Sequence, residues 1–336
     1  MKLKRFAACV LAAVLACMTV TGCGGSIDAN APGATLNGEE ISLGFMNFMA
    51  KYQQAAYDLS YVMFFGPDYW SQEVSEGETM EESAKSGIAE SVELLYLLED
   101  HMADYGIEIT QEETEAMKKA AEQFLSGNSK KAVKQMGATQ EYVEEMLRLY
   151  TIQQKMRTAI QEEADVEVTE EEAAQRTFSY FRVSATGTND DEGNTVDYTE
   201  EEKAELADQM KDTAAAAKKD FQGTADEKEY TVSTYSYGTD ETSMDENVIK
   251  AADGLKEGEI SDLITTDEYY YVIRLDSEFD EEKTAAKKES LINQKKSDYY
   301  TEVCDGYKEK ATFEINEGNW AKVKFDRLFG APAQEE

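Results

Sequence analysis

The first half of the chain carries apolar residues at the spacing of amphipathic helices. Apolar side chains recur every three or four positions, which places them on one face of a helix, and acidic or amide residues fill the other positions. A short strand and an Asn-Gly turn come first, in residues 34–42, where Ser42 is placed to cap the following helix. We expect helices over residues 43–65, 80–105, 111–125 and 139–163, with a shorter helix ending at Met136.

After residue 166 the pattern changes to short segments that are dense in aromatic and β-branched residues. Residues 178–184 and 269–275 have this composition, which favours strands over helices. The second half is therefore predicted to contain an α+β domain. Its other expected elements are a strand over residues 229–236, a polar loop over 187–198, and a helix over 199–221 that begins with a capping box.

The end of the chain combines one long charged helix with a late apolar cluster. The helix is expected over residues 281–310, and a short strand follows at residues 312–315. Aromatic residues so close to a terminus are typical of a segment that is buried, so we expect the end of the chain to pack on the rest of the protein. The cluster consists of Trp320, Val323, Phe325, Leu328 and Phe329.

The N-terminus has the features of a signal peptide. Lys2, Lys4 and Arg5 form a basic region, and residues 6–20 are apolar but too short for a typical membrane-spanning helix. The segment ends in Val-Thr-Gly-Cys, which resembles a bacterial lipobox and implies that Cys23 becomes the first residue and carries a lipid. The alternative is an ordinary secretory signal with a cysteine at that position by chance. Residues 24–33 are small and polar, which is typical of a flexible spacer.

The formal net charge of −36 excludes some classes of partner. Nucleic-acid binding requires a basic surface that displaces counterions, so we expect no nucleic-acid partner. Three of the four cysteines lie in or at the end of the signal segment, which leaves Cys304 without a disulfide partner and favours a buried structural cysteine. Acidic runs at residues 170–172 and 190–192 lack the spacing of a calcium loop, and we expect no metal or cofactor.

The segment of residues 255–276 resembles the closing segment of parvulin-type peptidyl-prolyl isomerase domains. The family's strand histidine falls on Tyr271 and its neighbouring glycine on Tyr269. The strand at residues 178–184 resembles the first parvulin strand through Ser179 and Val183, and there the histidine falls on Tyr180. The matching residues of the closing segment are Leu255, Lys256, Gly258, Glu259, Ile260, Ser261, Thr266, Tyr270, Val272, Ile273 and Arg274.

The helical half is similar to the chaperone module of the extracytoplasmic foldases related to PrsA and SurA. Those proteins open with a Val-Asn-Gly-x-x-Ile-Ser phrase before the first helix, which is similar to residues 36–42 here. The resemblance implies an α+β protein in which an inserted parvulin-like domain separates the N-terminal helices from a C-terminal helix that packs back on them. The implied domains are a signal peptide (1–22), a spacer (23–33), a helical N-domain (34–165), a parvulin-like domain (166–279) and a returning segment (280–336).

The resemblance makes Tyr180 and Tyr271 the candidate catalytic residues. Rotation about an X-Pro bond has a barrier of about 20 kcal/mol, and a catalyst must hold the proline ring and stabilise the twisted amide with polar groups. In active parvulins two facing histidines belong to that polar set. Tyrosine also donates and accepts hydrogen bonds, so the pair is either a working substitute or two core aromatics in a domain that has lost catalysis.

Three functional hypotheses follow. The first is a lipid-anchored extracytoplasmic foldase or chaperone for newly secreted polypeptides, with weak or absent isomerase activity, attached to the outer face of the cell membrane through Cys23. Methionine and aromatic side chains of the helix over residues 43–65 would supply part of its client-binding surface. The second is an active prolyl isomerase, and the third is a solute-binding lipoprotein. The sequence leaves the clients and the oligomeric state open, a homodimer included.

Overall fold

The structure is a computed structural model that describes residues 16–17, 27–189, 195–239 and 243–330. By internal contacts the chain divides into two compact units. The helical unit contains the described residues up to Ala164 and those from Ser297 onward, and the α+β unit contains the described residues from Asp165 to Lys296. The α+β architecture expected from the sequence is therefore confirmed.

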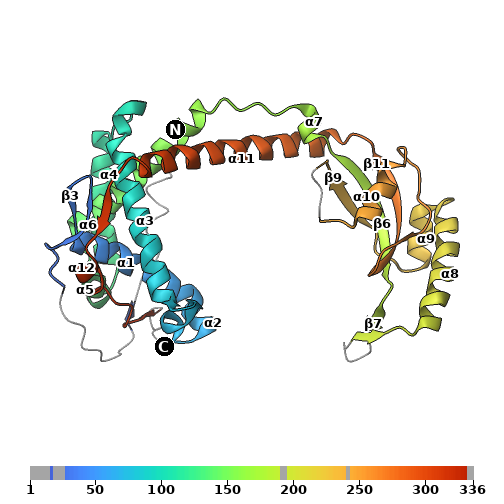
Figure 1. Cartoon of the computed structure of the whole chain (residues 1–336), viewed down its shortest axis with the longest axis horizontal. Coiled ribbons are helices and arrows are strands. Elements are labelled where there is room, and N and C mark those ends of the chain that lie inside the picture. Colours follow the sequence, from blue (N-terminus) through green and yellow to red (C-terminus); the bar gives the residue numbers. More distant parts are fainter. Residues whose placement is uncertain (1–15, 18–26, 190–194, 240–242, 331–336) are drawn as a thin grey trace. The chain divides into compact units, whose positions relative to one another are not determined.

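The helical unit contains the expected helices, and their ends lie close to the expected positions (Figure 1). The first helix changes from α to π geometry at Asp58–Val62 before it ends at Phe65. The loop expected after residue 67 contains a 3-10 turn at Tyr69–Ser71 and a hairpin of β4 (Glu73–Ser75) and β5 (Glu78–Thr79). The helices are α1 (Leu43–Tyr57), α2 (Met63–Phe65), α3 (Met80–Asp100), α4 (Gln111–Gly127), α5 (Lys130–Met136) and α6 (Gln140–Glu163).

A small antiparallel sheet joins the two ends of this unit. Strand β2 (Pro32–Leu36) pairs with β3 (Glu39–Ser42) on one side and with β12 (Phe313–Ile315) on the other. The turn between β2 and β3 requires positive φ at Asn37 (51°) and Gly38 (89°), which is why an Asn-Gly pair suits it. Two shorter pieces follow β12, namely α12 (Glu317–Trp320) and β13 (Phe329–Gly330), which pairs with β1 (Ala16–Cys17).

The C-terminal segment packs back on the N-terminal helices, as the sequence predicted. Trp320, Val323, Phe325 and Phe329 are buried in the same core as the aromatic side chains of α1. Helix α11 (Glu281–Lys308) begins in the α+β unit and ends in the helical unit. Its last turns bury Tyr300 and Cys304 in a second cluster with Leu98, Ile152, Met156 and Ile160.

The α+β unit is built on a four-stranded antiparallel sheet in the order β10-β11-β6-β9 (Figure 1). The long central strands β6 (Arg176–Ser184) and β11 (Tyr269–Ser277) come from the two ends of the unit. A hairpin of β7 (Gly187–Asn189) and β8 (Thr195–Asp197) stands where a polar loop was expected. The other elements are α7 (Glu170–Ala173), α8 (Glu200–Ala217), α9 (Phe221–Glu227), β9 (Ser233–Tyr237), α10 (Glu246–Asp253) and β10 (Ile264–Thr265).

Each face of this sheet is covered by its own helices. Successive strand residues point to opposite faces, so Phe181 and Val272 lie on one face and Phe178 and Ile273 on the other. Helices α8 and α9 cover the first face through Met210, Ala214, Ala217 and Phe221. Helix α10 packs on the second face through Val248 and Ala252. The tyrosines singled out in the sequence belong to this second face.

The helical unit contains a buried carboxylate that the apolar pattern does not reveal. Asp58 is 3% exposed and accepts hydrogen bonds from the backbone N–H of Phe329 (2.7 Å), Nε1 of Trp70 (2.7 Å) and Nε2 of Gln54 (3.3 Å). Burial raises the pKa of Asp58 to about 6, although these donors and the nearby Lys51 favour the charged form. Burial likewise lowers the pKa of Lys51 to about 8.

The raised pKa of Asp58 predicts a specific pH dependence of stability. The folded state binds the Asp58 proton more tightly than the unfolded state does, so protonation of Asp58 adds to the unfolding free energy. This added stability is fully present below pH 3.8 and is lost as the pH rises through about 6. Relative to Asp58→Asn, the wild type should lose about 2 kcal/mol of unfolding free energy between pH ~4 and ~7. Denaturant unfolding followed by tryptophan fluorescence measures this, since both tryptophans, Trp70 and Trp320, lie in the helical unit. A difference that stays constant with pH would contradict the prediction.

Candidate functional site

The two tyrosines predicted from the sequence as candidate catalytic residues meet on one face of the sheet. In the antiparallel pairing of β6 with β11, Tyr180 lies opposite Ile273 and Tyr271 lies opposite Arg182. The rings of Tyr180 and Tyr271 are therefore diagonal neighbours, and their centroids are 5.8 Å apart. The structure thus brings together the two residues that the sequence singled out.

Arg182 extends this pair into a cationic and aromatic cluster. Its Nη1 donates a hydrogen bond to the hydroxyl of Tyr271 at 3.2 Å, and its guanidinium carbon lies 4.0 Å from the ring centroid of Tyr269. The rings of Tyr269 and Tyr271 meet edge to face at 5.9 Å. The hydrogen bond to Tyr271 raises the pKa of Arg182. Sequence reasoning missed Arg182, although it stands two residues after Tyr180 and must share its face of the strand.

The signature residues of the closing segment hold β11 in place. Gly258 has φ of +82°, which a glycine adopts without strain, and its N–H donates to the carbonyl of Leu275 at 2.7 Å. Ser261 pairs with Ile273 twice, because its N–H donates to the Ile273 carbonyl (2.9 Å) and its hydroxyl accepts from the Ile273 N–H (3.1 Å). The hydroxyl of Thr266 accepts from the N–H of Tyr269 at 3.0 Å. These contacts fix the register that places Tyr271 beside Tyr180.

The cluster has the chemistry of a binding surface. Tyr271 is 4% exposed and Tyr180 is half-buried, whereas Arg182 is exposed, so a ligand at this face would meet the guanidinium and the accessible part of the Tyr180 ring. Such a donor can bind a carbonyl oxygen. Neither position carries an imidazole, and the single histidine of the chain, His101, belongs to the helical unit.

The remaining residues singled out in the sequence lie elsewhere. Cys23, proposed as the lipid attachment, and the acidic run 190–192 fall outside the described residues. Cys304 is buried, as predicted, and burial raises the pKa of its thiol. His101 packs its ring on Tyr307 with a centroid distance of 3.8 Å, and its Nδ1 lies 2.8 Å from a carboxylate oxygen of Asp104. We therefore interpret His101 as a packing residue.

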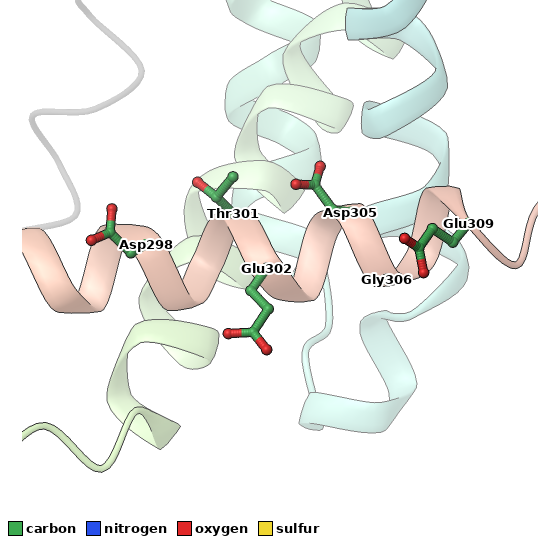
Figure 2. A pocket seen from close by; sticks show the side chains of 6 residues that line it. All are labelled: Asp298, Thr301, Glu302, Asp305, Gly306 and Glu309. Atoms are coloured by element: carbon green, nitrogen blue, oxygen red, sulfur yellow. The ribbon is translucent and has the colours of Figure 1, made fainter.

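An acidic hollow lies along the last turns of α11 (Figure 2). It is lined by Asp298, Thr301, Glu302, Asp305, Gly306 and Glu309. The carboxylates of Glu302 and Asp305 point to opposite sides of the helix in Figure 2. Within the described ranges, no group of three or more potential ligands is arranged to hold a metal ion. The described helices also include none that combines the length and the apolar character needed to cross a bilayer.

The α+β unit matches a known family. Residues 188–285 match the model of the PPIC-type PPIASE domain, that is, the parvulin-type domain. The match includes Tyr271 and begins after the strand that carries Tyr180. This part of the chain is therefore a parvulin-type domain, which confirms the prediction from its closing signature.

Several solved structures resemble the chain at low sequence identity. The foldase PrsA from Lactococcus lactis is 17% identical, with 87% of this chain and 97% of that chain covered and a TM-score of 0.37. PrsA from Streptococcus pneumoniae is 16% identical, with coverages of 76% and 99% and a TM-score of 0.31. A structure from the study of the SurA-like chaperones PEB4 and Cj1289 of Campylobacter jejuni is 11% identical, with coverages of 85% and 99% and a TM-score of 0.30. No curated protein matches the chain. These likenesses are too distant to assign a function.

The hydrogen bond between Arg182 and Tyr271 predicts different effects for two similar substitutions. Tyr271→Phe keeps the ring and removes the acceptor, so the unfolding free energy of the α+β unit should fall by about 1 kcal/mol. Tyr180→Phe is the matched control, since among the described residues its hydroxyl has no hydrogen-bond partner. Denaturation followed by the amide NMR signals of β6 and β11 measures both variants. Equal stability losses would contradict the assignment of the bond.

Proposed function

We propose that this chain is a lipid-anchored extracytoplasmic foldase or chaperone for newly secreted polypeptides, with weak or absent prolyl isomerase activity. The observation that carries the proposal is the match of residues 188–285 to the parvulin-type family. We take Tyr180 and Tyr271, whose rings are in contact, to stand at the positions of the parvulin histidines. Such a domain lacks the imidazoles that belong to the polar set of active parvulins, while the half-buried ring of Tyr180 and the exposed Arg182 stay accessible to a polypeptide. The net charge of −36 favours solubility and repulsion between copies of a protein that handles apolar clients.

Exposed aromatic side chains of the helical unit support the chaperone part of the proposal. Phe64 is 83% exposed, Phe65 59% and Tyr61 43%, and all three lie at the end of the first helix. Large apolar side chains gathered at one surface are typical of sites that bind other polypeptides. This is also the helix whose methionine and aromatic content suggested a client-binding surface from the sequence.

The second candidate function, an active isomerase, is favoured by one observation. The guanidinium of Arg182 and the hydroxyl of Tyr271 lie within a hydrogen bond of each other on the face where the parvulin histidines would stand. This pair could stabilise a twisted amide without imidazole. The solute-binding alternative has less support, because every strand pairing in the described part of the chain is antiparallel.

A proline-peptide isomerisation assay separates the first two candidates. We expect residues 24–336 to accelerate isomerisation by less than about tenfold, since removing one stabilising group from such a site typically costs about 10²–10³ in rate. Tyr271→Phe should then match the wild type. A large acceleration that this substitution abolishes would instead establish the isomerase.

Suppression of aggregation tests the chaperone proposal directly. The lipid-free chain, residues 24–336, should reduce light scattering by a chemically unfolded client at several-fold molar excess. The double substitution Phe64→Ser with Phe65→Ser should raise the excess required, because two exposed apolar rings are lost. Phe279→Ser is the matched control, since this 46% exposed residue lies in the other unit. No suppression by the wild type would count against the proposal.

The proposed anchor has its own test. Lipid on Cys23 should appear in mass spectra of the N-terminal peptide of the mature protein, and the protein should sediment with membranes. We expect Cys23→Ala to release it into the aqueous fraction, because a thioether-linked lipid then cannot form. Cys17→Ala, a control inside the predicted signal segment, should leave it with the membranes. Release of both variants, or of neither, would refute attachment at Cys23.

A further inference from the structure

The segment that follows α12 lies in the helical unit as an extended chain with alternating burial. Val323, Phe325 and Phe329 are buried, while Lys324 and Asp326 between them are exposed. Apart from the last two residues, which form β13, the segment 323–330 belongs to no helix or strand. Its apolar side chains join the core that α1 and α3 build.

Polar side chains of the helices bind the backbone of this segment. Four of them, Lys51, Gln54, Asp58 and Lys85, are at least nine-tenths buried, and a buried polar group is costly unless it is paired. Three backbone carbonyls of the segment accept hydrogen bonds: Val323 from Lys85 Nζ (2.9 Å), Lys324 from Lys51 Nζ, and Arg327 from the side-chain amides of Gln54 and Gln135 (2.9 Å each). Two backbone N–H groups donate to carboxylates: Phe325 to Glu81 (3.0 Å) and Phe329 to Asp58 (2.7 Å).

Contacts of this kind do not depend on the sequence of the bound segment. Carbonyls and N–H groups are the same in every polypeptide, so these side chains recognise an extended chain as such. Specificity comes from the positions that must be apolar. The ring of Phe325 fits edge to face against Trp70, with centroids 4.6 Å apart. Lys51 Nζ lies over the same ring, 5.2 Å from its centroid.

The helix side chains that contact residues 323–330 would line a groove if that segment left, and we call them the groove. It is continuous with the exposed aromatic side chains described above. The ring of Trp70 contacts Tyr69 at 5.1 Å, and Tyr69 stacks on Tyr61 at 6.0 Å and on Phe65 at 5.9 Å. One aromatic cluster therefore extends from the buried Phe325 to the exposed Phe65. An apolar segment that first touches the exposed end is already in contact with the wall of the groove.

We propose that this groove is a binding site for extended client segments with apolar residues at alternate positions, and that residues 323–330 are an internal ligand which such segments displace. The inference rests on the proposed chaperone function and specifies where and in what conformation a client is held. The internal ligand keeps the buried cations and carboxylate paired while no client is bound. Client segments compete for the same backbone contacts.

Hydrogen exchange on residues 24–336 tests the displacement. The probe is a synthetic peptide with the sequence of residues 319–330, blocked at both ends. At about ten times its measured dissociation constant, the peptide should displace the segment in about nine-tenths of the molecules, so the Phe325 and Phe329 amides should lose most of their protection from exchange. Amides of β6 and β11 in the α+β unit serve as the internal reference. A control peptide with serine at the positions of Val323, Phe325 and Phe329 should leave the exchange rates of both amides unchanged.

A variant of the internal ligand provides a second readout. Phe325→Ser should let the probe bind more tightly, up to about tenfold, because its competitor is weakened. Asp326→Ser, an exposed position in the same segment, is the matched control and should bind like the wild type. Circular dichroism establishes that both variants are folded. If Phe325→Ser is unfolded, the exchange experiment on the wild type still decides.

The outcomes also separate this inference from the proposed function. Amides that keep their protection at saturating probe, in a protein that suppresses client aggregation, would overturn the inference and leave the chaperone proposal standing. Displacement by the probe without any suppression would support the groove as a peptide site and count against the chaperone proposal. In the absence of probe, exchange of the Phe325 and Phe329 amides could become faster as the protein concentration rises, with a dimer seen in sedimentation. That result would assign the groove to the segment of a second copy and overturn the inference.

Discussion

The helical unit depends on a core that the N-terminal helices cannot complete alone. Phe45 and Phe48 of α1 share their core with Trp320 and Phe325, and the contacts between Lys51 or Gln54 and the last segment span 273 residues of sequence. Each buried Phe or Val of the last segment is worth roughly 1.5–3 kcal/mol, so a polypeptide that displaces this segment must replace its apolar contacts as it binds. Contacts over such distances in sequence also form late, because the chain between them must first be ordered.

In the α+β unit, too, a strand from the end of the unit's sequence pairs with a strand from its beginning. The central pair of its sheet joins the first strand of the unit to the last, and both cores are built on that pair. The signature residues Gly258, Ser261 and Thr266 act on this pairing and not on a substrate. These residues therefore serve the fold of the domain, whatever side chains its sheet face carries.

The sequence was most informative where local chemistry decides the structure. The capping box at Thr199 marked a helix start correctly, and the aromatic strands and their signature led to the parvulin-type domain. The short helix α9 and the β7–β8 hairpin were missed, because elements of a few residues are set by their neighbours and not by periodicity. Buried polar residues such as Lys51 and Asp58 were also missed, since in a helical pattern they look like any solvent-facing position.

The two points at which the chain enters and leaves the parvulin-type domain touch each other. The N–H of Gln175 donates to the hydroxyl of Thr284 at 3.0 Å, and its carbonyl accepts from the N–H of Asp280 at 2.8 Å. Chain ends that meet in this way can be cut and rejoined with a short linker, without stretching the backbone on either side. The geometry is that of an insertion, in which the segment between Gln175 and Asp280 begins and ends at nearly the same place.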